Sequence, residues 1–101
     1  MLLVLDIGNS NIVMGAYEGK RLLRHWRIST DRQKTGDEYG ILFNELFRYQ
    51  GIRMTDIEAI IISSVVPPLI VPLRKMCERY FHLRPLIVGP GIKTGIKLKY
   101  E

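Results

Sequence analysis

A short polar stretch near the N-terminus carries the residue types best suited to binding phosphate. Asp6 follows an apolar run, and Gly8-Asn9-Ser10-Asn11 comes almost directly after it. A carboxylate at the end of a strand can hold Mg²⁺ through water, because magnesium keeps several waters and takes few protein carboxylates. Gly8 has no Cβ, so nearby backbone N–H groups can approach a phosphate closely, and Ser10 adds a hydroxyl. The stretch therefore predicts a phosphate-binding loop beside a metal-binding carboxylate.

The same residues also fit a simpler interpretation. Asn, Ser and Gly are good turn residues, so residues 8–11 could close a β-turn that binds no ligand. Two other phosphate motifs are excluded, because no Gly-Lys-Ser/Thr follows and the G-x-G-x-x-G spacing is absent. On residue chemistry alone, the phosphate loop and the plain turn both stay open.

Other reactive side chains offer less chemistry. Ser63 and Ser64 follow a predicted buried strand, but the two histidines, His25 and His82, stand far from them in the sequence. A Ser–His nucleophile is therefore not expected. The single cysteine, Cys77, excludes an internal disulfide framework and a multi-cysteine zinc site, and we expect it in the core.

A three-strand meander is expected to position the polar stretch. Residues 2–7 form a continuous apolar run that is typical of a buried strand, and residues 11–17 form a second strand candidate. A glycine turn at 18–20 leads into residues 21–29, which alternate polar and apolar side chains as a half-exposed strand does. Asp6 thereby falls at the end of the first strand.

Two helices are expected to alternate with further strands. Thr35 and Glu38 form a capping box before an apolar stripe of helical spacing, which Gly51 ends. Residues 57–66 are β-branched and predict a strand that is covered on both faces. Pro67-Pro68 then begin a second helix, since proline costs little in a first turn.

The last part of the chain predicts one more strand. The second helix has an expected buried face, residues 85–88 form a short buried strand, and residues 96–100 form a further extended segment. The buried face comprises Leu69, Ile70, Leu73, Met76, Cys77, Tyr80 and Phe81.

The elements predict an α/β domain that spans residues 1–101 in the order β-β-β-α-β-α-β. Strands that alternate with helices imply right-handed crossovers and a mixed sheet whose later strands are parallel. A three-strand meander followed by αβαβ is the order of the ribonuclease H-like fold, which actin-like and hexokinase-like ATPase domains share. Fold alone does not give function, so the motifs must carry that argument.

Composition excludes several classes of protein. Hydrophobic residues make up 47% and charged residues 25% of the 101 residues, which is typical of a globular domain and not of disorder or collagen. The longest run without a charge, residues 59–73, is interrupted by prolines and is too short to span a membrane. The N-terminus lacks the basic segment of a signal peptide. We therefore expect a cytoplasmic protein with no membrane partner.

The net charge of +5 raises the question of nucleic acid. The basic residues are scattered, however, and aromatic residues are not interleaved with them as on a stacking surface. We therefore expect no nucleic-acid partner, while a small anion such as a nucleotide fits the charge equally well.

Five segments of the chain resemble type III pantothenate kinases, in the same order and over the whole length. They are Leu3–Val13, His25–Asp31, Thr35–Tyr39, Ile61–Pro68 and Val88–Gly95. The family belongs to the actin-like ATPase superfamily, in agreement with the predicted element order. It phosphorylates the hydroxyl of pantothenate with ATP, in the first step of coenzyme A synthesis. Older descriptions name its members Bvg accessory factor-like transcriptional regulators, so a non-catalytic regulator is the alternative.

The resemblance implies roles for particular residues. The phosphate loop over ATP would comprise Asp6, Ile7, Gly8, Asn9, Ser10, Asn11, Ile12 and Val13. Within it Asp6 would lie nearest the metal, and Ser10 keeps the hydroxyl of the more common threonine. Tyr100 matches a tyrosine that lines the pantothenate pocket. The resemblance further implies Mg²⁺, a monovalent cation (K⁺ or NH₄⁺) and a homodimer of the intact protein.

The family's general base has no counterpart in this sequence. It is the aspartate of a Gly-Ala-Asp-Arg segment that follows an Asn-Pro segment, and neither occurs in residues 1–101. The ligands of the monovalent cation and the second phosphate loop are missing too. We therefore expect residues 1–101 to be the N-terminal part of the kinase and to have little or no activity alone.

Overall fold

The computed structural model describes residues 1–89. The part of the Val88–Gly95 segment after Gly89, the predicted extended segment at 96–100 and Tyr100 within it lie outside the described residues. One mixed sheet of five strands has the order β3-β2-β1-β4-β5. Its strands are β1 (Leu2–Ile7), β2 (Asn11–Glu18), β3 (Arg21–Ser29), β4 (Ala59–Ser64) and β5 (Leu86–Val88).

Strand pairing confirms the predicted topology. β1 pairs with β2, and β2 with β3, in antiparallel fashion, so the first three strands form a meander. β4 pairs parallel to β1, and β5 parallel to β4. The connections from β3 to β4 and from β4 to β5 each contain a helix. Such long crossovers are needed because a parallel strand must start again at the same end of the sheet as its neighbour.

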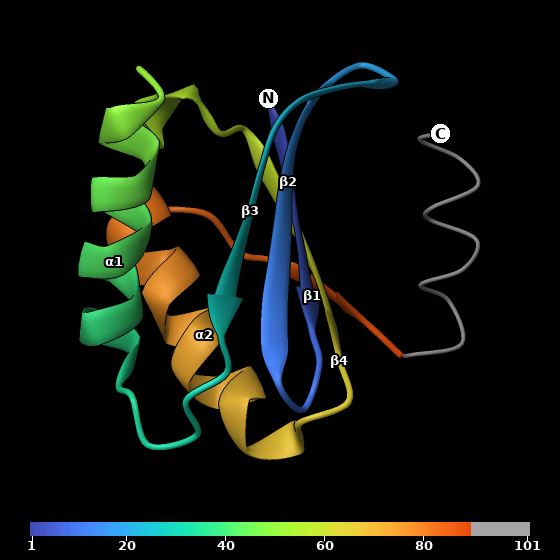
Figure 1. Cartoon of the computed structure of the whole chain (residues 1–101), viewed down its shortest axis with the longest axis vertical. Helices are drawn as coiled ribbons and strands as arrows, with labels where there is room; N and C mark the ends of the chain where they lie inside the picture. Colours follow the sequence, from blue (N-terminus) through green and yellow to red (C-terminus); the bar gives the residue numbers. More distant parts are fainter. Residues whose placement is uncertain (90–101) are drawn as a thin grey trace.

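Two helices pack on the same side of the sheet (Figure 1). α1 (Gly36–Tyr49) begins at the predicted capping box, in which Thr35 Oγ1 accepts from the Glu38 N–H and the Glu38 carboxylate accepts from the Thr35 N–H. Gly51 follows α1 with a φ of +73°, which confirms the predicted glycine end. α2 (Ile70–Met76) continues through a wider turn at Cys77–Phe81.

Two predicted boundaries are wrong by a few residues. β4 covers Ala59–Ser64 rather than 57–66. At its end the Val66 N–H donates to the Ser64 hydroxyl instead of to a neighbouring strand. The second helix does not begin as α-helix at Pro67-Pro68. These residues form a 3₁₀ turn, Pro67–Leu69, before α2 starts.

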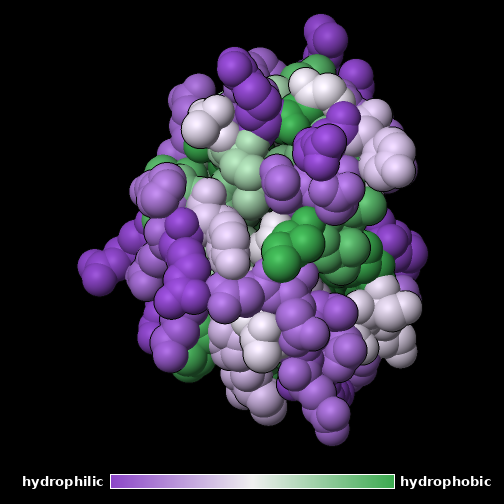
Figure 2. Space-filling model, turned by 90° about the vertical axis from the view of Figure 1, so that its left-hand side faces the viewer, coloured by the Kyte–Doolittle hydropathy of each residue, from purple (hydrophilic) through white to green (hydrophobic). Residues whose placement is uncertain are grey.

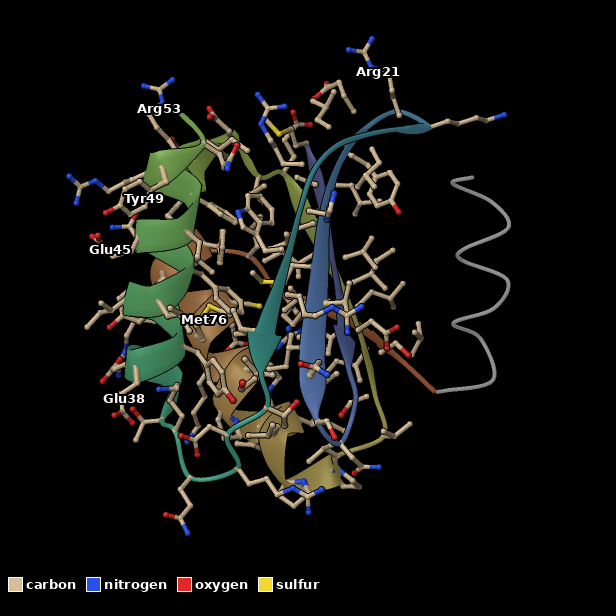
Figure 3. The ribbon with its side chains drawn as sticks, viewed as in Figure 1. Arg21, Glu38, Glu45, Tyr49, Arg53 and Met76 are labelled. Atoms are coloured by element: carbon tan, nitrogen blue, oxygen red, sulfur yellow. The ribbon has the colours of Figure 1, made fainter. Side chains whose placement is uncertain are left out.

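The core lies between the sheet and the helices. Alternate residues of β1 and β2 face the helices and are fully buried, whereas the residues between them are half-buried on the opposite face. α1 contributes Tyr39, Phe43 and Phe47, and the Phe47 ring lies 4.9 Å from the Trp26 ring on β3. Met76 of α2 lies between α1 and the sheet (Figure 3).

Cys77 is part of this core, as predicted. Its side chain is completely buried, and burial raises the pKa of the Cys77 thiol to about 12. The thiolate form, which is the reactive one, is therefore negligible near neutral pH.

The outer surface of the helical layer is mainly hydrophilic, with separate hydrophobic areas (Figure 2). The large hydrophobic side chains that stay exposed on the two helices are Ile41, Tyr49 and Val71. In the described residues, no helix combines the length and the hydropathy needed to cross a membrane.

A close contact joins α1 to the end of the second helical segment. Gly40 is buried, and a Cβ at this position would lie 2.5 Å from Cδ2 of the Tyr80 ring. The Tyr80 hydroxyl donates to Asp37 at 2.8 Å, and Arg79 donates to the same carboxylate oxygen at 2.9 Å. The pKa of Asp37 lies below its usual range, mainly because of the Tyr80 hydrogen bond and to a smaller extent because of Arg79.

We expect Gly40→Ala to destabilise the protein although alanine is the better helix former. The added methyl group must displace the Tyr80 ring, and such overpacking costs about 1–3 kcal/mol, against a gain of about 1 kcal/mol in helix propensity. Urea denaturation should show a lower midpoint. In a Tyr80→Ala background the same substitution should be stabilising; a midpoint that falls equally in both backgrounds would contradict this account.

Candidate functional site

The candidate site lies at the edge of the sheet where the parallel strands end. β1, β4 and β5 run in the same direction, so their carboxyl ends meet at this edge. The turn from β1 to β2 is at the same end of the molecule (Figure 1). In open α/β sheets, ligands bind outside the carboxyl ends of the strands, so a ligand site is expected at this edge.

The turn itself is a tight hairpin closure. The Gly8 N–H donates to the Asn11 carbonyl at 2.9 Å, and a Cβ on Gly8 would lie 3.2 Å from that carbonyl oxygen. Residues 8–11 therefore close a β-turn, as the simpler interpretation predicted. The N–H groups of Asn9 and Ser10 take no part in this bond, and both residues are exposed. A turn of this shape leaves backbone donors at its tip for an anion.

A shallow pocket of about 270 Å³ opens beside the turn. It is lined by Asp6, Gly8, Ser10, Asn11, Val13 and Arg27. Five of these six belong to the stretch that the sequence predicted. The structure thus brings together a carboxylate, a hydroxyl and a glycine of that stretch in one pocket.

The remaining residues of the predicted stretch face elsewhere. The side chains of Ile7 and Ile12 are fully buried among the core residues, so only their backbone groups can contact a ligand. Asn9 does not line the pocket, and its amide oxygen accepts a hydrogen bond from Arg32 at 2.8 Å. Strand alternation explains the division, since neighbouring residues of a strand point to opposite faces.

Arg27 is the pocket residue that the sequence analysis did not identify. It lies on β3 opposite Val13 of β2, and Val13 lies opposite Asp6 of β1. The three residues therefore form one row across the face of the sheet opposite α1 and α2 (Figure 1). The alternation of β3 could have placed Arg27 on its polar face, but the register that brings it beside Asp6 is decided by strand pairing.

The segment after β3 holds the turn in place. Thr30 Oγ1 donates to the Gly8 carbonyl at 2.8 Å, and the Thr30 N–H donates to the Ser10 carbonyl at 2.9 Å. The turn is thus bound on both sides of Asn9. These bonds occupy the carbonyl oxygens of Gly8 and Ser10 and fix the backbone of the turn against the segment after β3.

Tyr39 connects this arrangement to helix α1. Its hydroxyl donates to the Asp31 carbonyl at 2.7 Å and accepts from the Asp31 N–H at 3.0 Å. Burial raises the pKa of Tyr39, so the hydroxyl keeps its proton at neutral pH. The turn at residues 8–11 is therefore supported through Thr30 and Asp31 by a buried side chain of the core.

We expect Thr30→Val to loosen the turn without unfolding the protein. The substitution keeps the side-chain shape but leaves the Gly8 carbonyl without its donor, which costs about 1 kcal/mol in the free energy of unfolding. Any ligand bound by the turn should then bind several-fold more weakly. Thr55→Val, in the exposed 3₁₀ turn Met54–Asp56, is the matched control and should change neither quantity. Equal binding by both variants would contradict the supporting role of Thr30.

Asp6 is the candidate metal ligand in this pocket. It is half-buried at the end of β1, and Ser10 lines the same pocket. No group of three or more His, Cys, Asp or Glu side chains that could hold a metal occurs within residues 1–89. A single carboxylate fits Mg²⁺, which fills the rest of its shell with water and phosphate oxygens, and does not fit zinc, which needs several protein ligands.

The serines at the end of β4 have a structural role. The Ser64 hydroxyl donates to the Val66 carbonyl at 3.1 Å and accepts from the Val66 N–H. Ser63 is buried and lies in register with Asp6. His25 is exposed on β3, and His82 is exposed beyond the second helix with a φ of +58°. The expectation that no Ser–His pair forms is consistent with this arrangement.

The strand order, with an antiparallel meander joined to parallel strands, defines a ribonuclease H-like domain. Two solved structures share it. The ROK hexokinase of Thermus thermophilus matches 87% of this chain with 34% of its own, at a TM-score of 0.61 and 24% identity. Thermus thermophilus RuvC matches 88% of this chain with 63% of its own, at a TM-score of 0.52 and 18% identity. At these identities the likeness concerns the fold.

Sequence comparison identifies the family within this class. The model of the type III pantothenate kinase family matches residues 2–101, and the chain belongs to that family. A type III pantothenate kinase of Geobacter sulfurreducens is 59% identical over 101 residues, which is all of this chain and 40% of the relative. The chain thus spans about two fifths of the length of that curated relative. None of these comparisons supports the alternative of a transcriptional regulator.

Proposed function

We propose that residues 1–101 are the N-terminal nucleotide-binding domain of an ATP-dependent pantothenate kinase. The whole enzyme would phosphorylate pantothenate to 4′-phosphopantothenate, the first step of coenzyme A synthesis. The observation that carries the proposal is the pocket in which Asp6, Gly8 and Ser10 meet, in a chain that belongs to this family. Its partners are the two small molecules ATP and pantothenate, and neither nucleic acid nor a membrane.

The turn at 8–11 would bind the phosphates of ATP. Phosphoryl transfer depends mostly on positioning and on neutralising the charge of the transferred group. The exposed N–H groups of Asn9 and Ser10 and the Ser10 hydroxyl can donate to phosphate oxygens. Asp6 would hold Mg²⁺, which neutralises phosphate charge when it is bound. Because Thr30 ties the turn to the sheet, these donors are held in place before the nucleotide arrives.

The remaining parts of the catalytic machinery are assigned outside residues 1–89. We place Tyr100 in the wall of the pantothenate pocket. The general base and the ligands of a monovalent cation, K⁺ or NH₄⁺, belong to the part of the protein that residues 1–101 do not include. We further propose that the intact protein is a cytoplasmic homodimer.

A coupled ATPase assay of the full-length protein tests the proposal. It should show ADP release that depends on pantothenate and Mg²⁺ and is stimulated by K⁺ or NH₄⁺, and mass spectrometry should find 4′-phosphopantothenate. Residues 1–101 expressed alone should show no turnover in the same assay. ADP release by the full-length protein that does not respond to pantothenate would contradict the proposed acceptor.

A further inference from the structure

Arg27 is a positively charged side chain at the rim of the candidate site, with no role in the fold of the described residues. It is exposed on β3 and lines the same pocket as Asp6, Gly8 and Ser10. Within residues 1–89 its side chain forms no hydrogen bond and no ion pair, whereas the side chains of other arginines, such as Arg32 and Arg79, are bound to side chains. Among residues 1–89, no group occupies the guanidinium that lines this pocket.

The strand register fixes where that charge lies. Arg27, Val13 and Asp6 are direct neighbours across β3, β2 and β1. Strands lie about 4.8 Å apart, so the backbones of Arg27 and Asp6 are about 10 Å apart on the same face. The pocket is thus bounded by a carboxylate on one side and a guanidinium on the other, with the turn at its end.

This arrangement of charges suits a polyphosphate ligand better than a ligand with one carboxylate group. A polyphosphate can be held by a cation-binding carboxylate at one point, by backbone donors at another, and by a guanidinium at a third. Guanidinium binds phosphate through two parallel hydrogen bonds, and these charge-assisted bonds are stronger than neutral ones. A lone carboxylate ligand would gain nothing from Asp6 and would be repelled by it.

We propose that Arg27 binds the β- or γ-phosphate of the nucleotide, as a third contact beside the turn and the metal-binding Asp6. The inference rests on the proposed function, since it names a contact within the same nucleotide site. It assigns β3, an edge strand of the sheet, a direct part in ATP binding. The backbone turn alone would then be insufficient for full affinity.

Equilibrium binding of ATP to the full-length protein, with Mg²⁺ present, tests this contact. Arg27→Gln should raise the Kd for ATP about 10- to 100-fold, the range expected for loss of a charge-assisted hydrogen-bond pair. Arg27→Lys keeps the charge but not the paired geometry and should lose less. The KM for ATP should rise in parallel, with the KM for pantothenate unchanged.

Arg21→Gln is the matched control. Arg21 begins the same strand and is exposed, but it lies at the opposite end of the sheet from the β1–β2 turn (Figure 3). The Arg21→Gln substitution removes the same charge from the same strand but at a distance from the pocket. The variant should therefore bind ATP with the Kd of the unmodified protein. Equal weakening by Arg21→Gln and Arg27→Gln would show only an effect of net charge and would overturn the assigned contact.

The outcomes separate this inference from the proposed function. If the unmodified protein phosphorylates pantothenate and Arg27→Gln binds ATP with unchanged Kd, the contact is wrong and the function stands. If Arg27→Gln raises only the KM for pantothenate, Arg27 faces the acceptor and the phosphate assignment is overturned. If the unmodified protein binds no ATP, both fail. Circular dichroism of each variant establishes that it is folded, and Arg27→Lys supplies the test should Arg27→Gln not fold.

Discussion

Replacement of Asp6 by asparagine is expected to reduce kcat of the full-length kinase by about 10²- to 10³-fold, the usual cost of losing one electrostatic contact at the reacting groups. Asparagine keeps the size of the side chain and removes the negative charge. The pocket then loses the carboxylate that we assign to Mg²⁺. The Mg²⁺ concentration for half-maximal activity should rise as well, which steady-state kinetics over a range of Mg²⁺ would measure.

Asp31→Asn is the control for this experiment. Asp31 is exposed close to the same turn but does not line the pocket, and among residues 1–89 its carboxylate accepts a bond from the Gln33 N–H alone. Asparagine can accept the same bond, so the variant should keep its activity and its Mg²⁺ dependence. An Asp6→Asn protein with full activity at ordinary Mg²⁺ would remove Asp6 from the site.

Replacement of Phe47 by alanine is expected to lower the free energy of unfolding by about 3–5 kcal/mol, the usual cost of deleting a buried aromatic ring. Phe47 is completely buried, with ring centroids 4.9 Å from Trp26 and 5.9 Å from Phe81. Its ring therefore joins β3, α1 and the end of the second helical segment. Urea denaturation of residues 1–101, followed by circular dichroism, would measure the loss.

Tyr49→Ala removes an aromatic ring from the same helix without opening the core. Tyr49 is 86% exposed and points away from the sheet (Figure 3). Its loss should change the free energy of unfolding by less than about 0.5 kcal/mol, as is usual at the surface. If the two substitutions destabilised the protein equally, the contacts of the Phe47 ring with Trp26 and Phe81 would not be what stabilises α1 against the sheet.

Most of the fold could be predicted because its signals are local. The buried run at 2–7, the capping box at Thr35 and the glycine end at Gly51 each depend on residues a few positions apart. One of the two boundary errors arose where a side chain competes with a strand neighbour for a backbone N–H. Ser64 ends β4 early through its own hydrogen bond, and no pattern of apolar residues reports such a bond.

The site could be predicted in part for the same reason. Asp6, Gly8 and Ser10 lie within five positions of one another, so one turn collects them into the pocket. Which residues of the stretch line the pocket and which lie in the core depends on where each side chain points, and only the folded structure gives that. Arg27 comes from β3 and is identified by the strand register, and Thr30 comes from the segment after β3 and is identified by its hydrogen bonds to the turn.

The sequence by itself determined the element order, the amphipathic faces and the turn at residues 8–11, because each is encoded by neighbours along the chain. The tertiary structure decided which distant residues meet that turn. Strand pairing set Arg27 in one row with Asp6, Thr30 bonds the turn from the segment after β3, and Tyr39 of α1 bonds the neighbouring Asp31 backbone. Register depends on the free energy of the whole packed sheet, since a slip of one residue would turn every side chain to the other face.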